Sequence, residues 1–146
     1  MAEYFVDTGV FVRWFIEQIG WEHARKVRDE YLQGFVGLVT VDFVRIETAN
    51  VLRKVGLQGG VFVDTEAYVT AVRAIDDLGI VAHATDVDML ERAARLAATN
   101  SLRIFDALIA MHAMDQGMTL LTSDQKLCRA VDGLMSTELL QGIATT

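Results

Sequence analysis

The sequence predicts an α/β fold with a mainly parallel central sheet. Short apolar runs rich in β-branched residues alternate along the chain with longer segments that carry helix signals, which is the pattern of strand–helix–strand units. Apolar residues stand at consecutive positions within the short runs, as in strands that are buried on both faces. The 146 residues, 52% hydrophobic and 23% charged, match one domain with a well-filled core and exclude a disordered chain.

Four strands are predicted from the apolar runs, at residues 4–6, 35–40, 79–82 and 119–122. Parallel strands are joined by crossover helices, and the segments between these runs are long enough to supply them. Open parallel sheets bind their ligands at the carboxyl ends of the strands. We therefore expect functional side chains at residues that directly follow a strand.

Helix boundaries are predicted from capping residues. Segments 85–88 (TDVD) and 122–125 (TSDQ) both fit a capping box, with Thr85 and Thr122 as the N-cap residues. The stretch 56–60 reads as a loop inside one domain. Several glycines follow helical runs, where a left-handed residue is favoured: Gly34, Gly56, Gly79 and Gly117.

The overall charge is acidic, with 13 basic and 20 acidic residues and a formal net charge of −7. Taken alone, this balance argues against nucleic-acid binding, which usually needs a basic footprint. No apolar stretch reaches the roughly 18 residues of a membrane-spanning helix, and no signal-peptide pattern opens the chain. The single cysteine, Cys128, cannot form an intrachain disulfide, so we expect a cytoplasmic protein in which Cys128 is a small buried hydrophobe.

Two acidic residues directly follow predicted strands. Asp7 comes after the strand at 4–6, and Asp124 comes two residues after the strand at 119–122. Both are expected at carboxyl ends of the sheet, where a ligand would bind. Either residue would also serve as the N-cap of the helix that follows it, and the sequence leaves that alternative open.

Two further acidic residues fall within apolar helical patterns. Glu47 shares a helical stripe with Val44, Val51 and Val55, and Asp106 begins the apolar helix over 104–114. A buried, unpaired carboxylate is costly, so each needs a compensating partner. The alternatives to a metal ligand are a buried salt bridge for Glu47 and a helix-dipole interaction for Asp106.

The four acidic residues together predict a metal site at one end of the sheet. Clustered carboxylates repel one another unless cations neutralise them, and hard oxygen ligands favour Mg²⁺ or Mn²⁺. Such ions lower the pKa of a bound water and stabilise charge on a phosphate. The expected chemistry is therefore hydrolysis of a phosphodiester.

Segments of the chain resemble the acidic motifs of PIN-domain ribonucleases, and most closely those of VapC-type toxins from toxin–antitoxin pairs. The segments are 6–8 (VDT), 46–53 (IETANVLR), 105–110 (FDALIA) and 121–127 (LTSDQKL). The resemblance runs over the whole chain, which makes residues 1–146 a single PIN-like domain. It implies a three-layer α/β/α sandwich, a Mg²⁺- or Mn²⁺-dependent endoribonuclease acting on RNA, a homodimer, and inhibition by a small antitoxin protein.

The resemblance also implies roles for individual residues. Asp7 and Asp106 would carry the central metal directly, while Glu47 and Asp124 would complete the acidic pocket through water or a second ion. Thr122 would orient Asp124 or a bound water. The chain departs from the family in one place, because Gly9 stands where Ser or Asn is usual, two residues after the first acid. A hydroxyl that would help to hold the pocket is missing there.

Two other functional classes are weighed against the nuclease. A phosphotransfer domain of the receiver or haloacid-dehalogenase type is disfavoured, because neither an acid pair nor a second Asp accompanies Asp7. A non-catalytic PIN-fold module that binds RNA or a partner is supported by Gly9 but not by the retention of all four acids.

The basic and the aromatic side chains each leave two interpretations open, whereas the histidines do not. The clustered basic residues either form a solvated face or contact RNA phosphates. They are Arg25, Lys26, Arg28, Arg45, Arg53 and Lys54. Phe11, Trp14, Phe15 and Trp21 form part of the core or a partner groove. His23, His83 and His112 are expected to have ordinary packing or surface roles.

The acidic charge is compatible with an RNA substrate once the pocket is considered. Four of the twenty acidic residues belong to the proposed site, and two divalent ions would change the formal net charge from −7 to −3. We therefore expect RNA binding to be weak without metal. A basic segment of the antitoxin is expected to fit the same pocket.

Overall fold

The computed structural model describes residues 1–142. Within these residues, five strands form one parallel sheet in the order β3-β2-β1-β4-β5. The strands are β1 (Ala2–Val6), β2 (Val36–Val41), β3 (Val81–His83), β4 (Thr119–Thr122) and β5 (Thr137–Leu139). The predicted α/β fold with a parallel central sheet is therefore confirmed.

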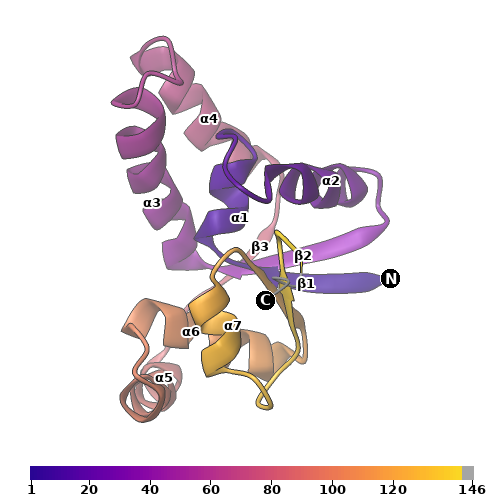
Figure 1. Cartoon of the computed structure of the whole chain (residues 1–146), viewed down its shortest axis with the longest axis vertical. Coiled ribbons are helices and arrows are strands. Elements are labelled where there is room, and N and C mark those ends of the chain that lie inside the picture. Colours follow the sequence, from indigo (N-terminus) through magenta and orange to yellow (C-terminus); the bar gives the residue numbers. More distant parts are fainter. Residues whose placement is uncertain (143–146) are drawn as a thin grey trace.

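Helices cover both faces of the sheet, which gives three layers (Figure 1). On one side lie α1 (Thr8–Arg13), α2 (Trp21–Leu32), α3 (Asp42–Val51), the π-helix η1 (Leu52–Leu57) and α4 (Thr65–Asp77). On the other side lie α5 (Val87–Asn100), α6 (Ile104–Gln116) and α7 (Gln125–Ala130). None of the helices in the described part of the chain is long and apolar enough to cross a membrane.

β1 begins at Ala2 instead of residue 4, and β2 is shifted by one residue, while the larger differences from the prediction are at β3 and β5. β3 starts at Val81 instead of residue 79, because Gly79 adopts a left-handed conformation with φ of +67° and turns the chain after α4. The edge strand β5 is absent from the prediction. Its three residues are only partly buried and pair with β4 alone, so no continuous apolar run marks them.

Two predicted N-cap residues are wrong by one or two positions. Asp86 caps α5 by accepting a hydrogen bond from the Met89 N–H, and Asp124 caps α7 in the same way. The hydroxyl groups of Thr85 and Thr122 bond elsewhere, to His112 and Asp7. The N-cap residues are therefore aspartates, one residue after Thr85 and two residues after Thr122.

Among the glycines predicted to end helices, Gly34, Gly79 and Gly117 have the expected left-handed φ. Gly56 does not, and its prediction as a loop residue is wrong, because it belongs to η1. A Cβ at Gly56 would overlap the ring of Phe62, so a close approach explains this glycine.

The core lies on the central strands and extends under α1. Phe5, Val6, Leu120 and Leu121 are fully buried. The predicted aromatic group divides: Phe11 and Trp14 are buried in this core with their ring centroids 4.8 Å apart, whereas Phe15 and Trp21 are only partly buried. This continuous core fixes the strand ends from which Asp7 and Asp124 project.

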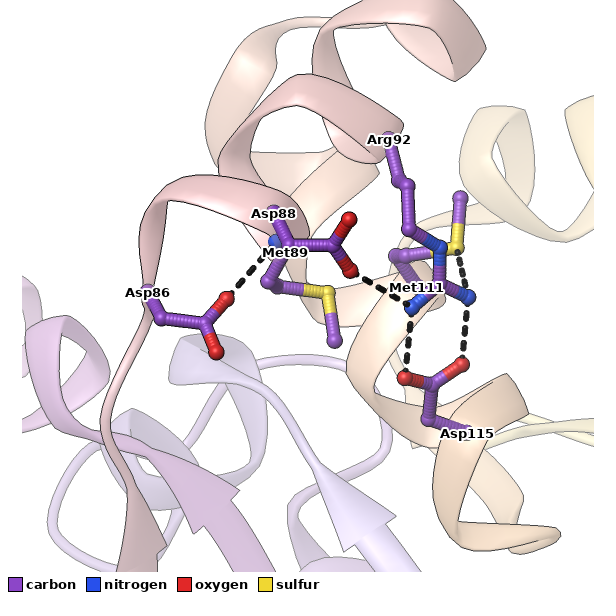
Figure 2. Close-up of polar contacts among 6 residues, drawn as sticks. All are labelled: Asp86, Asp88, Met89, Arg92, Met111 and Asp115. Carbon is purple, nitrogen blue, oxygen red and sulfur yellow. Dashed lines mark hydrogen bonds and ion pairs between the residues drawn. The ribbon is translucent and has the colours of Figure 1, made fainter.

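The pair α5 and α6 is held together at its surface by Arg92 (Figure 2). Its guanidinium donates to both carboxylate oxygens of Asp115, at 2.7 and 2.6 Å, and lies 3.9 Å from Asp88. Beneath it, a small apolar cluster joins the two helices through Met89, Ala93, Ala107 and Leu108. These contacts position α6, whose first turn carries Asp106.

Candidate active site

The candidate site begins where β1 and β4 end side by side. Val6 pairs with Leu121, so Asp7 and Thr122 lie next to each other at the carboxyl edge of the sheet. The Thr122 hydroxyl donates a hydrogen bond to Asp7 Oδ2. Asp7 is 7% exposed, and its other oxygen, Oδ1, is buried without a hydrogen-bond partner among residues 1–142. A buried carboxylate oxygen of this kind is uncommon and calls for a ligand.

The environment of Asp7 favours its protonated form. Burial raises the pKa of Asp7 from its ordinary 3.8 to about 6. Hydrogen bonds from Thr122 and from the Val10 backbone act in the opposite direction, whereas the charges of Asp124 and Asp106 raise the pKa further. A cation beside Oδ1 would reverse this preference.

Asp106 lies in the first turn of α6 and is half-buried. Burial raises its pKa, and the charges of Asp124 and Glu47 add to that effect. The positive charges of Arg103 and Lys126 lower it. The fold therefore brings Asp106 within electrostatic range of the other predicted acids, although they are far apart in sequence.

Asp124 is both a neighbour of the other acids and a helix cap. Its Oδ1 accepts the Leu127 N–H at 3.0 Å, and its own backbone N–H donates to Thr122 Oγ1 at 3.0 Å. Thr122 thus holds the Asp7 side chain and the Asp124 backbone at the same time. The predicted role of Thr122 in orienting Asp124 has this physical basis, and its role toward a bound water stays a prediction.

Glu47 lies at the rim of the core and not within it. Its side chain is 29% exposed, and Oε1 accepts a hydrogen bond from Thr8 Oγ1 at 2.5 Å. The predicted apolar stripe is wrong beyond α3, because Val55 is 36% exposed. The π-helix η1 begins at Leu52, and its wider turns change the helical phase on which the stripe depended.

Basic side chains that the sequence did not single out stand beside the acids. Arg13 Nη1 donates to the Gly9 carbonyl at 3.0 Å, and its charge interacts with that of Asp7 while burial lowers its pKa. Arg103 Nη2 lies 3.6 Å from Glu47 Oε2. Lys126 acts on Asp106 from the first turn of α7. These residues are dispersed in the sequence, so only the fold reveals their grouping.

Most of the basic cluster singled out by the sequence forms ion pairs with nearby acids. Arg45 makes two hydrogen bonds to Asp76, at 2.7 and 2.8 Å. The other pairs are Arg25 with Glu17, Lys26 with Glu30 and Arg28 with Asp29. These contacts favour the solvated-face interpretation for the paired residues over RNA contact.

The position of Gly9 has a steric explanation. A Cβ at Gly9 would overlap the hydroxyl oxygen of Ser123 and lie 3.2 Å from Arg13 Nη1. Ser123 stands between Thr122 and Asp124, so a hydroxyl is present at this end of the site. It comes from the β4–α7 loop instead of from α1.

The donor set fits a hard divalent cation in its chemistry. All four predicted residues supply carboxylate oxygens, and Asp7 Oδ1 is buried without a partner, which suits Mg²⁺ or Mn²⁺. Among residues 1–142, however, no three His, Cys, Asp or Glu side chains are grouped closely enough to hold a metal ion. The acids therefore share one electrostatic neighbourhood without forming a preassembled set of ligands.

The contacts of His83 and His112 lie away from the acids. His112 is buried, with Nε2 at 3.1 Å from Thr85 Oγ1, and its ring stacks on those of Phe5 and His83. This matches the predicted packing role of His112, but the proximity of His83 could not be read from sequence spacing. Cys128 is only partly buried, which differs from its prediction as a buried residue. Burial raises the pKa of the Cys128 thiol and the charges of Asp124 and Asp7 raise it further, so Cys128 lies close to the site.

Comparisons with known proteins place this geometry among related folds. The PIN domain family model matches residues 4–133. Comparison with curated proteins returned no match. Three solved structures illustrate the similarity. A toxin–antitoxin complex from Klebsiella pneumoniae is 16% identical, with a TM-score of 0.66 over 98% of this chain and 100% of that chain.

The other two structures come from Mycobacterium tuberculosis. VapC20, described as a sarcin–ricin loop cleaving toxin, is 16% identical, with a TM-score of 0.68 over 87% of this chain and 94% of that chain. VapBC-5, a member of the VapBC family of toxin–antitoxin systems, is 25% identical, with a TM-score of 0.53 over 95% and 98%. At these levels of identity, the similarity supports the fold and the order of its elements.

Proposed function

The chain belongs to the PIN-domain family, and on that premise we propose that it is a metal-dependent endoribonuclease, the toxin of a type II toxin–antitoxin pair. The observation that carries this proposal is the buried, unpartnered Oδ1 of Asp7 at the carboxyl edge of the sheet. Further support comes from the charges of Asp124 and Asp106, which act on Asp7, and from those of Asp124 and Glu47, which act on Asp106. Their mutual repulsion makes the site a place for cations.

Each residue has a distinct role in the proposed reaction. Asp7 and Asp106 would hold the metal, and Glu47 and Asp124 would complete the pocket. A bound Mg²⁺ or Mn²⁺ would supply an activated water and stabilise charge on the phosphate. The Thr122 hydroxyl donates to Asp7 Oδ2, so Oδ1, which has no partner among residues 1–142, is the oxygen that would bind the metal.

We also propose a small antitoxin protein as the partner. The support is the similarity to VapBC-5 and to the Klebsiella pneumoniae complex, both of which are toxin–antitoxin assemblies by their descriptions. An acidic site would accommodate a basic side chain of such a partner. The homodimer and the cytoplasmic location expected from the sequence stay predictions.

The direct test measures cleavage of single-stranded RNA with Mg²⁺ or Mn²⁺ and with EDTA. We expect cleavage only with metal, and none from Asp7→Asn or Asp106→Asn. Asp77→Asn is the matched control, because Asp77 is exposed at the end of α4. This variant should cleave RNA like the wild type. Cleavage that persists in EDTA would contradict the proposal.

A thermal-shift measurement with Mn²⁺ separates binding from catalysis. We expect Mn²⁺ to raise the melting temperature of the wild type and of Asp77→Asn, but not that of Asp7→Asn. A normal metal response without RNA cleavage would favour the non-catalytic PIN-fold module instead.

A further inference from the structure

An aromatic side chain beside the acidic site is partly exposed to solvent. Phe105 stands directly before Asp106 at the start of α6, and it is 43% exposed. Its inner neighbour is Phe43 from α3, with the two ring centroids 5.2 Å apart and the rings tilted by 56°. Phe43 itself packs against the core. Phe105 is therefore supported from behind and partly open to solvent, which is the arrangement of a stacking surface.

A cation adjoins the same ring. The guanidinium carbon of Arg103 lies over the Phe105 ring, 5.8 Å from its centroid, and Arg103 Nη2 is 3.6 Å from Glu47 Oε2. The Arg103 side chain is 67% exposed, so its remaining donors reach solvent. One residue thus lies close to both the aromatic ring and the acidic pocket.

The surrounding charges restrict what this surface would bind. The four carboxylates repel a phosphate backbone, whereas Arg103 and Lys126 supply positive charge close to Asp106. A ligand suited to both features has an apolar flat group for Phe105 and an anionic group for Arg103. An unpaired nucleotide of an RNA strand has this combination of chemistry.

We propose that Phe105 and Arg103 form a nucleotide subsite for single-stranded RNA, in which an unpaired base stacks on Phe105 and its phosphate contacts Arg103. This inference rests on the proposed function, because it takes RNA as the substrate. In duplex RNA the bases are stacked and paired, so their faces are not available to Phe105. The subsite therefore selects single-stranded RNA over duplex RNA.

The test measures binding of a fluorescent, short single-stranded RNA by anisotropy, in EDTA and at low salt, where weak binding without metal is strengthened. A gel verifies that the RNA stays intact. Base stacking on an aromatic side chain changes affinity by about tenfold or more. We expect Phe105→Ala and Phe105→Leu to weaken binding by about this factor, and Phe105→Trp to retain it. Leucine keeps the apolar packing on Phe43 but lacks a π face.

Two further variants complete the design. Arg103→Ala should weaken RNA binding and make it less dependent on salt concentration. Arg103→Lys keeps the positive charge, so it should lose less affinity and less salt dependence than Arg103→Ala. Phe35→Ala is the matched control, because Phe35 is 65% exposed but lies just before β2, at the opposite edge of the sheet. It should bind RNA like the wild type. Unfolding curves verify that every variant is folded.

The outcomes separate this subsite from the proposed nuclease. Wild-type affinity in both Phe105→Ala and Phe105→Leu, or equal affinity for duplex RNA, would overturn the subsite even if metal-dependent cleavage is found. Binding that depends on Phe105, without any cleavage in Mn²⁺, would sustain the subsite and reject the nuclease. Loss of antitoxin binding alone in Phe105→Ala would assign this surface to a protein partner and overturn the RNA subsite.

Discussion

The hydroxyl of Ser123 occupies the space that a side chain at position 9 would need, since a Cβ on Gly9 would overlap Ser123 Oγ. Two segments that are more than a hundred positions apart in sequence thus fit together only with a glycine on one side. Ser123 lies between Thr122, which holds Asp7, and Asp124, which belongs to the same site. The glycine therefore has a packing reason of its own.

The first prediction is a coupling between positions 9 and 123. Gly9 lies in α1, where alanine would ordinarily gain roughly 1 kcal/mol over glycine. In the wild type we expect Gly9→Ala to give no net stabilisation, because the Ser123 hydroxyl has to move to make room for the new methyl group. In the Ser123→Ala background the Ser123 hydroxyl is absent and only the flexible end of Arg13 stays close, so Gly9→Ala should stabilise the protein. Urea unfolding of the four proteins should give a coupling free energy on the order of 1 kcal/mol. Additive effects of the two substitutions would show that the overlap has no energetic consequence.

The second prediction concerns the stability of the metal-free protein as a function of pH. The pKa of Asp7 is raised to about 6 in the folded state, against 3.8 ordinarily. The folded state therefore binds the proton more tightly, so the contribution of Asp7 to stability is present at low pH. It is lost as pH rises through about 6. In EDTA at about pH 7, Asp7→Asn should be more stable than the wild type by on the order of 3 kcal/mol.

Two comparisons isolate this effect. The difference between Asp7→Asn and the wild type should nearly vanish below about pH 4, where both side chains are neutral. Mn²⁺ should reduce or reverse it at neutral pH by stabilising only the wild type. A wild type that is more stable than Asp7→Asn in EDTA at neutral pH would contradict the cost assigned to the buried carboxylate.

The third prediction concerns Thr122, whose buried hydroxyl joins Asp7 and Asp124. Thr122→Val keeps the shape but removes the donor to Asp7 Oδ2 and the acceptor for the Asp124 N–H. Because a hydrogen bond to a charged group contributes about 1.5–3 kcal/mol, the variant should lose stability of this order at neutral pH. Thr122→Ser keeps the hydroxyl and should lose only about 1 kcal/mol for the missing methyl group. Equal losses in chemical unfolding would show that packing, not the hydroxyl, is what Thr122 contributes.

Parts of this site could be predicted because local rules determine them. Asp7 and Asp124 follow buried strands, and neighbouring parallel strands deliver such residues to the same edge of a sheet. Asp106 could be predicted because a carboxylate within a helix that is otherwise apolar and buried needs a compensating partner. In each case, the signal lies within a few residues of the functional side chain.

The remaining features depend on contacts between distant segments. Arg13, Arg103 and Lys126 meet the acids only through the tertiary fold, since no periodicity links them. The apolar stripe predicted through Glu47 is wrong from η1 onward. The prediction assumes the same number of residues in every helical turn, and a π-helix has more residues per turn than an α-helix. The overlap at Gly9 requires coordinates for Ser123. Such relationships need the fold before they can be stated.

The fourth prediction separates the two roles of Asp124, as helix cap and as acid of the site. Asp124→Ala removes the acceptor of the Leu127 N–H and should lose about 1 kcal/mol, whereas Asp124→Ser keeps an acceptor and should lose only a few tenths. Both variants lack the carboxylate, so both should show a smaller rise in melting temperature with Mn²⁺. Asp86 is the matched control, since it caps α5 through the Met89 N–H without facing the site. Asp86→Ala should therefore lose stability like Asp124→Ala while keeping the full response to Mn²⁺. If Asp124→Ser also keeps that response, Asp124 is a helix cap alone and the metal site consists of the other three acids.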